Sequence, residues 1–320
     1  MLSRVADSLY WMSRYLERAE HTVCLLDVNM SLMLDRSATS DEGRWKRVLA
    51  ALGHPKDVSW EDDYYQIVHS LTFDPDIPAS ITSCLMAARE NARQVRDEIS
   101  SEQWQQLNRM YHRATARTHG NGMENSLSEF LPAVLDGVHL FQGVTDTTMS
   151  HGEGWQFIQM GRYLERAAAI ANLLDVYHAE IFITSEEAAE GALDREWVGL
   201  LRCCTAFEAY CKVYTADLAA DRILEFLLLN SEFPHSLRYS IDCVRQSLQA
   251  VQQLSGRQHA EELGRVSGRL QASLDFVDVD EILAQDAATY LHGILQQCRM
   301  IHELIYKYYI HYSVEAALAM

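Results

Sequence analysis

The stretch LYWMSRYLERAEHTVCLLDV (9–28) contains the six residues RYLERA, and FIQMGRYLERAAAIANLLDV (157–176) repeats them. Matching Arg14 to Arg162 gives an offset of 148 residues (162 minus 14), at which eleven of the seventeen residues from 12 to 28 have identical partners. A match of this length is unlikely to arise by chance. It predicts an internal duplication, in which two helical units pack about a pseudo-twofold axis.

Each copy has the apolar periodicity of a long helix. Every third or fourth residue is apolar from Leu2 to Met33, and the same spacing runs from Phe157 to Ile181 with His178 as its interruption. A stripe with this period is typical of a helix that is buried along one side. The sequence therefore predicts two long helices, with further helices between and after them, about ten in all.

The fold class follows from composition and from a second, fainter repeat. Only five prolines occur and none follows Pro234, which leaves long stretches of good helix formers. At an offset of 156 (234 minus 78), Pro78 pairs with Pro234 and Ser80 with Ser236. We expect an all-α multi-helix bundle with a first helical repeat at 1–150 and a second at 151–320, the two merging into one domain.

Charge and cysteine usage narrow the classes of function. The formal net charge of −18 opposes binding to nucleic acid or to an anionic membrane. No apolar run is long enough for a signal sequence or a membrane span, so a cytoplasmic location is expected. The seven cysteines show no CxxC spacing, and the histidines are scattered. We therefore expect neither a disulfide framework nor a metal site.

The charged residues of RYLERA lie on the helix face opposite the apolar stripe. On a helical wheel Arg14, Arg18 and His21 share that face, with Trp11 before them and Leu25 after them. A charged layer between apolar side chains indicates a cleft or an interface. A freely solvated face would not need the apolar neighbours.

The spacing Arg-x-x-Glu-Arg has two interpretations. It places a carboxylate between two guanidiniums, which can orient an arginine for a bidentate grip on a carboxylate or a phosphate. It can equally form an inter-helix layer of salt bridges that fixes how the two copies pack. Both interpretations stay open for each copy of the motif. The first copy consists of Arg14, Glu17 and Arg18, and the second of Arg162, Glu165 and Arg166.

A second group of arginines, Arg89, Arg93 and Arg96, lies in AARENARQVRDEIS (87–100) beside an apolar stripe. At the offset of 156, Arg93 and Arg96 correspond to Gln249 and Gln252, so the second copy lacks these charges. If the charged layer forms a binding site, the first copy is expected to carry more of it. We expect this row to meet Arg14, Glu17 and Arg18.

LSRVADSLYWMSRYLERAEHTVCLLDV (2–28) resembles the opening signature of the bacterial alpha-E family, helical proteins with a Glu-Arg motif, and AARENARQVRDEISSEQWQQLN (87–108) resembles its second block. The likeness runs through essentially the whole chain. It places the Glu-Arg motif on Glu17 and Arg18, with Glu165 and Arg166 as the internal copy. This chain has Ser13 where the family usually has glycine.

The resemblance implies a role in a peptide-modifying or small-metabolite pathway. Alpha-E proteins are typically encoded beside, or fused to, a circularly permuted ATP-grasp ligase, often with a transglutaminase-like protease nearby. No nucleotide-binding motif occurs in this chain. The implied partner is therefore the ligase, which would bring the ATP. The sequence also leaves open whether the chain forms a homo-oligomer.

The first hypothesis is a helical partner of an ATP-grasp-type amide ligase that binds an anionic substrate or intermediate. Its catalytic candidates are Glu17 and Glu165, and its substrate-binding candidates are Arg14, Arg18, Arg89, Arg93, Arg96, Arg162 and Arg166. The alternative is a non-catalytic interaction protein, in which the repeated layers are packing salt bridges. Whether the chain is itself an enzyme is not decided by its sequence.

Overall fold

A computed structural model describes residues 1–33, 40–53, 63–117, 124–179, 193–215, 217–255 and 261–311. Every secondary-structure element that these residues form is helical, which confirms the all-α prediction. Fourteen α-helices occur in these ranges, more than the ten expected, because several connections contain short helices. The internal duplication and the division at residue 150 stay predictions; that division falls between α6 and α7.

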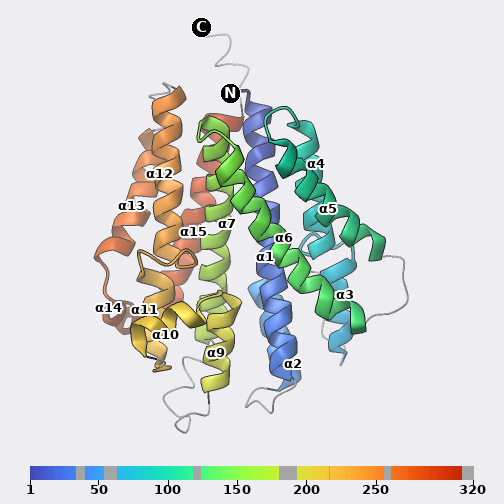
Figure 1. Ribbon diagram of the computed structural model, residues 1–320. Helices are drawn as coiled ribbons and strands as arrows, with labels where there is room; N and C mark the ends of the chain where they lie inside the picture. Colours follow the sequence, from blue (N-terminus) through green and yellow to red (C-terminus); the bar gives the residue numbers. More distant parts are fainter. Residues whose placement is uncertain are drawn as a thin grey trace.

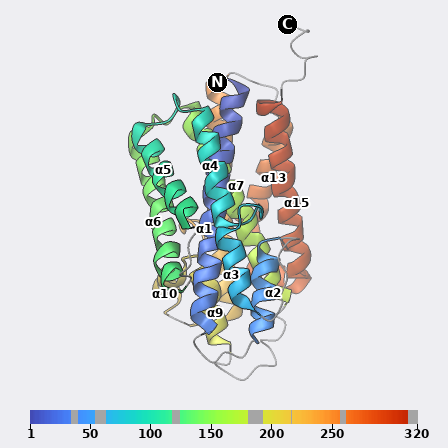
Figure 2. The same ribbon diagram turned by 90° about the vertical axis from the view of Figure 1, so that its right-hand side faces the viewer.

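Two long helices form the centre of the molecule, α1 (Ser3–Met33) and α7 (Glu153–Tyr177). They pack against each other between the other helices, as Figures 1 and 2 show. The amino group of Met1 lies 2.7 Å from the Glu153 carboxylate, so both helices begin at the same end and run parallel. These are the two helices that carry the RYLERA repeats.

The remaining helices flank this central pair (Figure 1). The α1 side holds α3 (Tyr64–Phe73), α4 (Ile81–Gln94), α5 (Ser101–Arg117) and α6 (Glu124–Thr148). The α7 side holds α12 (Leu237–Ser255), α13 (Glu261–Phe276) and α15 (Ala287–Ile305), which continues into the π-helical turn η2 (Tyr306–Ile310). The shorter helices are α2 (Asp41–Ala51), α9 (Asp194–Cys203), α10 (Phe207–Tyr214), α11 (Ala220–Leu229) and α14 (Val279–Gln285).

Capping side chains explain where several flanking helices begin. Ser80 Oγ accepts a hydrogen bond from the Ser83 amide at 3.1 Å at the start of α4. At the start of α5, the Ser100 amide donates to Gln103 Oε1 at 2.8 Å, while the Gln103 amide donates to Ser100 Oγ at 3.1 Å. This reciprocal pair satisfies two amides that the first turn of a helix leaves without partners.

The backbones of α1 and α7 approach closely at Gly161. A Cβ atom at this position would lie 2.2 Å from the carbonyl oxygen of Tyr10 and 2.2 Å from Ser13 Oγ. No side chain fits there without moving the helices apart. Gly161 therefore brings the two charged segments into direct contact.

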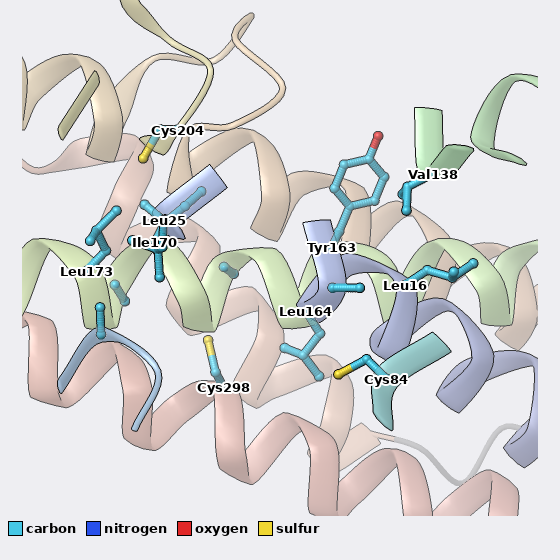
Figure 3. Packing of buried hydrophobic residues seen from close by; sticks show 14 of the residues in the cluster. Leu16, Leu25, Cys84, Val138, Tyr163, Leu164, Ile170, Leu173, Cys204 and Cys298 are labelled. Carbon is cyan, nitrogen blue, oxygen red and sulfur yellow. The ribbon is translucent and has the colours of Figure 1, made fainter. Parts of the chain in front are cut away.

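The apolar stripes form one continuous core around the central pair. Leu9, Met12 and Ala19 of α1 have no exposed surface, as the periodicity predicts. In Figure 3, apolar side chains surround α7: Leu164 points toward α15 and α4, while Ile170 points to the opposite side. Among the described helices, none combines the length and the apolar character that crossing a membrane requires.

Candidate anion-binding cavity at the charged layer

The second RYLERA glutamate is held by the arginines of the first. The Nε atom of Arg14 donates to Glu165 Oε2 at 2.6 Å, and the Nε atom of Arg18 donates to Glu165 Oε1 at 2.7 Å. Burial, the largest influence, would raise the pKa of Glu165, but the charges of Arg14 and Arg18 hold that pKa below its ordinary value. Both carboxylate oxygens of Glu165 therefore accept hydrogen bonds from arginines.

The first RYLERA glutamate is held by the arginines of the second. Arg166 donates two hydrogen bonds to the Glu17 carboxylate, one of them from Nη2 to Oε2 at 2.9 Å. Arg162 Nε lies 3.7 Å from Glu17 Oε2. Each glutamate thus pairs with two arginines of the other helix, which is the inter-helix arrangement that the sequence left open beside pairing within one helix. The reason is the close approach at Gly161, which brings each carboxylate to the opposite guanidiniums.

We call these six residues the charged layer: Arg14, Glu17, Arg18, Arg162, Glu165 and Arg166. The layer has two unlike sides. A cavity of about 630 Å³ opens on the side of Glu165. On the side of Glu17, two cavities line the carboxylate, and each has a volume of only about 20 Å³. One side of the layer is therefore open to a ligand, and the other is filled.

The large cavity is cationic on its polar wall. Arg18 uses Nε for Glu165, and its terminal nitrogens donate no hydrogen bond to any described residue. Arg299 of α15 also lines the cavity, is exposed, and forms no ion pair within the described ranges. The rest of the lining is largely apolar and includes Ile77, Pro78 and Leu295. A pocket with a few polar groups on an apolar lining is the usual form of a small-molecule site.

Two histidines of the cavity wall were not singled out as site residues by the sequence. Burial lowers the pKa of His21 to about 4, and its Nε2 atom is buried without a hydrogen-bond partner among the described residues. His302 Nδ1 lies 2.9 Å from Tyr10 Oη and 3.0 Å from Arg14 Nη1, so it accepts from the guanidinium. Burial, and then the charge of Arg14, lower the pKa of His302 to about 4. Both rings are neutral at pH 7.

The filled side contains a cluster around Glu20. Its carboxylate accepts a hydrogen bond from Gln142 Nε2 at 2.9 Å and lies 3.2 Å from His139 Nε2 and 3.7 Å from His235 Nε2. Burial would raise the pKa of Glu20, but the hydrogen bond with His139 and the charge of Arg166 hold it well below its ordinary range. Glu20 is therefore a buried carboxylate with several partners.

This cluster has one feature of a metal site. Ligand atoms of Glu17, Glu20 and His235 lie within 4.8 Å of one another. However, Arg166 Nη2 lies 2.9 Å from Glu17 and 3.8 Å from Glu20. The guanidinium already supplies the positive charge between these carboxylates. A divalent cation would have to displace it, so we assign no metal to this place.

The second arginine row lies away from the charged layer. Arg89 Nε donates to Asn108 Oδ1 at 2.7 Å and its guanidinium lies 4.3 Å from the centre of the Tyr111 ring. Arg93 pairs with Glu90 at 2.7 Å on the exposed surface. Arg96 donates to a backbone carbonyl. None of the three lines the large cavity.

The structure thus divides the predicted site residues into three groups. Arg14, Arg18 and Glu165 line the large cavity. Glu17, Arg162 and Arg166 lie on the filled side, where Arg162 also donates to Gln142 Oε1 at 2.7 Å. Arg89, Arg93 and Arg96 belong to the surface around α4 and α5.

Comparison with known proteins places the chain in a family. A protein of Mycobacterium bovis and one of Mycobacterium tuberculosis, both described as uncharacterized, are each 27% identical over 94% of this chain. The match covers 36% of those relatives, so the chain spans about a third of their length. No solved structure gives a significant match. Residues 1–310 match the model of Alpha-E, a predicted alpha-helical domain with a conserved ER motif, and the chain belongs to this family.

Proposed function

We propose that this Alpha-E chain binds a small anionic substrate or intermediate in the large cavity, as the helical partner of an ATP-grasp-type amide or peptide ligase. One observation carries the proposal: Arg18 and Arg299 line a cavity of about 630 Å³, and among the described residues the terminal nitrogens of Arg18 donate no hydrogen bond and Arg299 forms no ion pair. Arginine suits both carboxylates and phosphates, because its planar donors match their oxygens.

The cavity supports binding more than proton transfer. Glu165 contacts Arg14 and Arg18, and its lowered pKa makes it a weak base. Glu17 does not line the cavity. We therefore assign Glu165 the role of positioning the two arginines. In this proposal the ligase performs the ATP-dependent chemistry, and the helical chain binds and presents the anion.

The partnership rests on the family resemblance and on the length of the relatives. In the mycobacterial proteins, a region like this chain is joined to further sequence about twice as long, since the match covers 36% of each relative. This is what a helical unit that works beside another domain would show. The seven cysteines are free thiols, which supports the expected cytoplasmic location. A transglutaminase-like protease would belong to the same system.

A second candidate function is a purely structural one, and the reciprocal ion pairs favour it. Glu17 and Arg166 are almost completely buried, and each carboxylate of the layer is occupied by arginines. Such a layer fixes the register of two helices. The structural role accounts for the filled side and for the pair between Arg18 and Glu165, but it does not explain why the terminal nitrogens of Arg18 and the Arg299 side chain line a large cavity.

Anion binding tests the proposal directly. We expect butyrate or inorganic phosphate to bind the purified chain at low ionic strength, measured by ligand-observed NMR and by thermal shift. Arg18→Gln and Arg299→Gln should each weaken binding by about tenfold or more, since a charge-assisted hydrogen bond contributes about 1.5–3 kcal/mol.

Arg269→Gln is the matched control, because Arg269 is an exposed arginine of α13 outside the cavity. It should leave anion binding unchanged. The proposal is wrong if neither anion binds, or if the control weakens binding as much as the cavity variants. A coupled assay with an ATP-grasp ligase then tests the partnership: product formation should fall in Arg18→Gln and persist in Arg269→Gln.

A further inference from the structure

The two sides of the charged layer carry the same kinds of pairs but differ in what covers them. Arg166, on the filled side, has 2% of its side chain exposed, whereas Arg18, which occupies the same place in its own RYLERA segment, has 29% exposed. The difference lies in the neighbours of each guanidinium. Those neighbours indicate what the open side is built to receive.

The first difference is a carboxylate. Glu20 follows Glu17 by three residues on α1, and Ala168 follows Glu165 by three residues on α7. The Glu20 carboxylate approaches Arg166 Nη2 at 3.8 Å. Ala168, with only a methyl group, lines the large cavity. The filled side thus has a second carboxylate near its arginine, and the open side has space.

The second difference is a ring. His235 precedes Ser236, and Ala79 precedes Ser80, in the two segments that the sequence pairs through Pro78 and Pro234. The His235 ring lies against Glu20, with Nε2 at 3.7 Å from the carboxylate. Ala79 lines the large cavity. Two alanines therefore replace a glutamate and a histidine, which accounts for much of the space beside Arg18.

We propose that the ligand of the cavity carries a carboxylate on a short aliphatic stem, and that this carboxylate occupies beside Arg18 the place that Glu20 occupies beside Arg166. This inference rests on the proposed function and narrows its substrate class. The Glu20 side chain, a carboxylate on a short aliphatic stem, therefore resembles the part of the ligand that binds beside Arg18. The methylene groups of the stem lie against Ala79 and Ala168, as the stem of Glu20 lies within the filled side.

Charge balance favours a single negative charge. On the filled side two carboxylates, Glu17 and Glu20, face Arg162 and Arg166. On the open side Glu165 alone faces Arg14 and Arg18, so one more carboxylate gives the same balance. A phosphate dianion would add a second charge close to the Glu165 carboxylate, where it is repelled. Arg299 also lines the cavity, but its side chain is exposed, so solvent screens its attraction for a second negative charge.

The first experiment compares butyrate with inorganic phosphate on the wild-type chain. Butyrate should bind about tenfold more tightly than phosphate, a difference of about 1.4 kcal/mol. Equal binding, or tighter binding of phosphate, overturns the inference and leaves the proposed anion-binding function standing. If neither anion binds, the proposed function fails as well. The two failures are therefore distinguishable.

The second experiment builds the filled side's carboxylate into the cavity. Ala168→Glu should abolish butyrate binding, because its own carboxylate pairs with Arg18. Ala168→Gln is the matched control, since it fills the same volume without a charge. Ala168→Glu should melt at a higher temperature than Ala168→Gln. If it melts lower, or still binds butyrate like the wild type, no carboxylate belongs beside Arg18.

The third experiment empties the filled side. Glu20→Ala removes a fragment that acetate can replace, so acetate should raise the melting temperature of this variant more than that of the wild type. Phosphate at equal ionic strength should not. Glu102→Ala, at an exposed glutamate of α5, should show no extra response. A Glu20→Ala variant that folds and ignores acetate contradicts the resemblance between the Glu20 side chain and the ligand. If it does not fold, the Ala168 pair decides.

Discussion

Buried charge at the layer is tolerated because every carboxylate has more than one partner. Glu17 has 4% of its side chain exposed, and burial raises its pKa despite the opposing charge of Arg166. Removing one partner of such a pair typically costs about 3–5 kcal/mol, because the other charge stays buried. The layer therefore constrains the fold strongly, even where its net contribution to stability is small.

His21 gives the clearest pH dependence. Its pKa is about 4 in the folded chain and about 6.5 in the unfolded chain. Between these two pH values the ring is protonated in the unfolded state and neutral in the folded state. Stability is therefore lost as the pH falls from 6.5 toward 4. Between pH 7 and pH 5, the free energy of unfolding of His21→Asn should fall by about 2 kcal/mol less than that of the wild type, as measured by urea denaturation.

His112→Asn is the control for this measurement, since His112 is an exposed residue of α5. It should follow the wild-type pH dependence. A His21→Asn variant that also loses as much stability as the wild type would mean that the ring is not held neutral in the folded chain.

Part of the cavity could be predicted from the sequence at this scale. The wheel places Arg14, Arg18 and His21 on one face, and all three line the cavity. His302 could not be found in this way, because it lies 288 residues from Arg14 in sequence and reaches it through packing. The sequence also led us to expect Arg89 beside the charged layer, but Arg89 does not line the cavity. A wheel gives the face of a helix, but not the helix that this face contacts.

At the scale of elements, the two central helices were the most predictable part of the fold. Their periods extend over many turns, and α1 and α7 form where the stripes lie. Short helices such as α10 and α14 were harder, since one or two turns carry too few apolar positions to show a period. The cavity itself depends on Ala79 and Ala168. An alanine that leaves space looks, in sequence, like an alanine that fills a core.

The closest contact between elements predicts a large effect from one methyl group. Gly161→Ala places a Cβ atom 2.2 Å from the Tyr10 carbonyl oxygen, and backbone cannot yield as a side chain can. We expect a loss of about 2–3 kcal/mol in the free energy of unfolding, as for other overpacked contacts. Urea denaturation at pH 7 measures it.

Gly143→Ala is the matched control, because Gly143 lies on exposed α6 with no atom within 4 Å of the added Cβ. It should be neutral or stabilise the chain by up to about 1 kcal/mol, since alanine favours helix. If both variants change the free energy of unfolding by the same amount, α1 and α7 do not approach at Gly161 as closely as described above.

At the scale of the whole molecule, a cationic cavity lies in an acidic chain. The net charge of −18 repels anions at long range, whereas Arg18 and Arg299 attract them at the cavity. Moderate salt screens the long-range repulsion more than the short contacts inside the cavity. The surface charge thus opposes the binding of polyanions, and under the proposed function the cavity would bind small anions that make direct contacts with its arginines.

The charged layer also consists of ion pairs between the two predicted repeats. Glu17 in residues 1–150 has its partners Arg162 and Arg166 in residues 151–320, and Glu165 has its partners in the first segment. Either segment alone would expose one side of the central pair and leave a carboxylate among apolar groups. The two segments should therefore fold only together.

Expressing residues 1–150 and 151–320 as separate chains tests this dependence. Each fragment alone should show helical far-ultraviolet circular dichroism without a cooperative thermal transition, and mixing them should restore the transition and the dispersion of the NMR spectrum. Glu165→Arg in the second fragment should prevent this recovery, because it would face Arg14 and Arg18 of the first. Glu208→Arg, at an exposed residue of α10 that forms no ion pair among the described residues, should allow it. A fragment that melts cooperatively by itself would mean that the repeats are independent domains, and that the layer joins two folded units after folding.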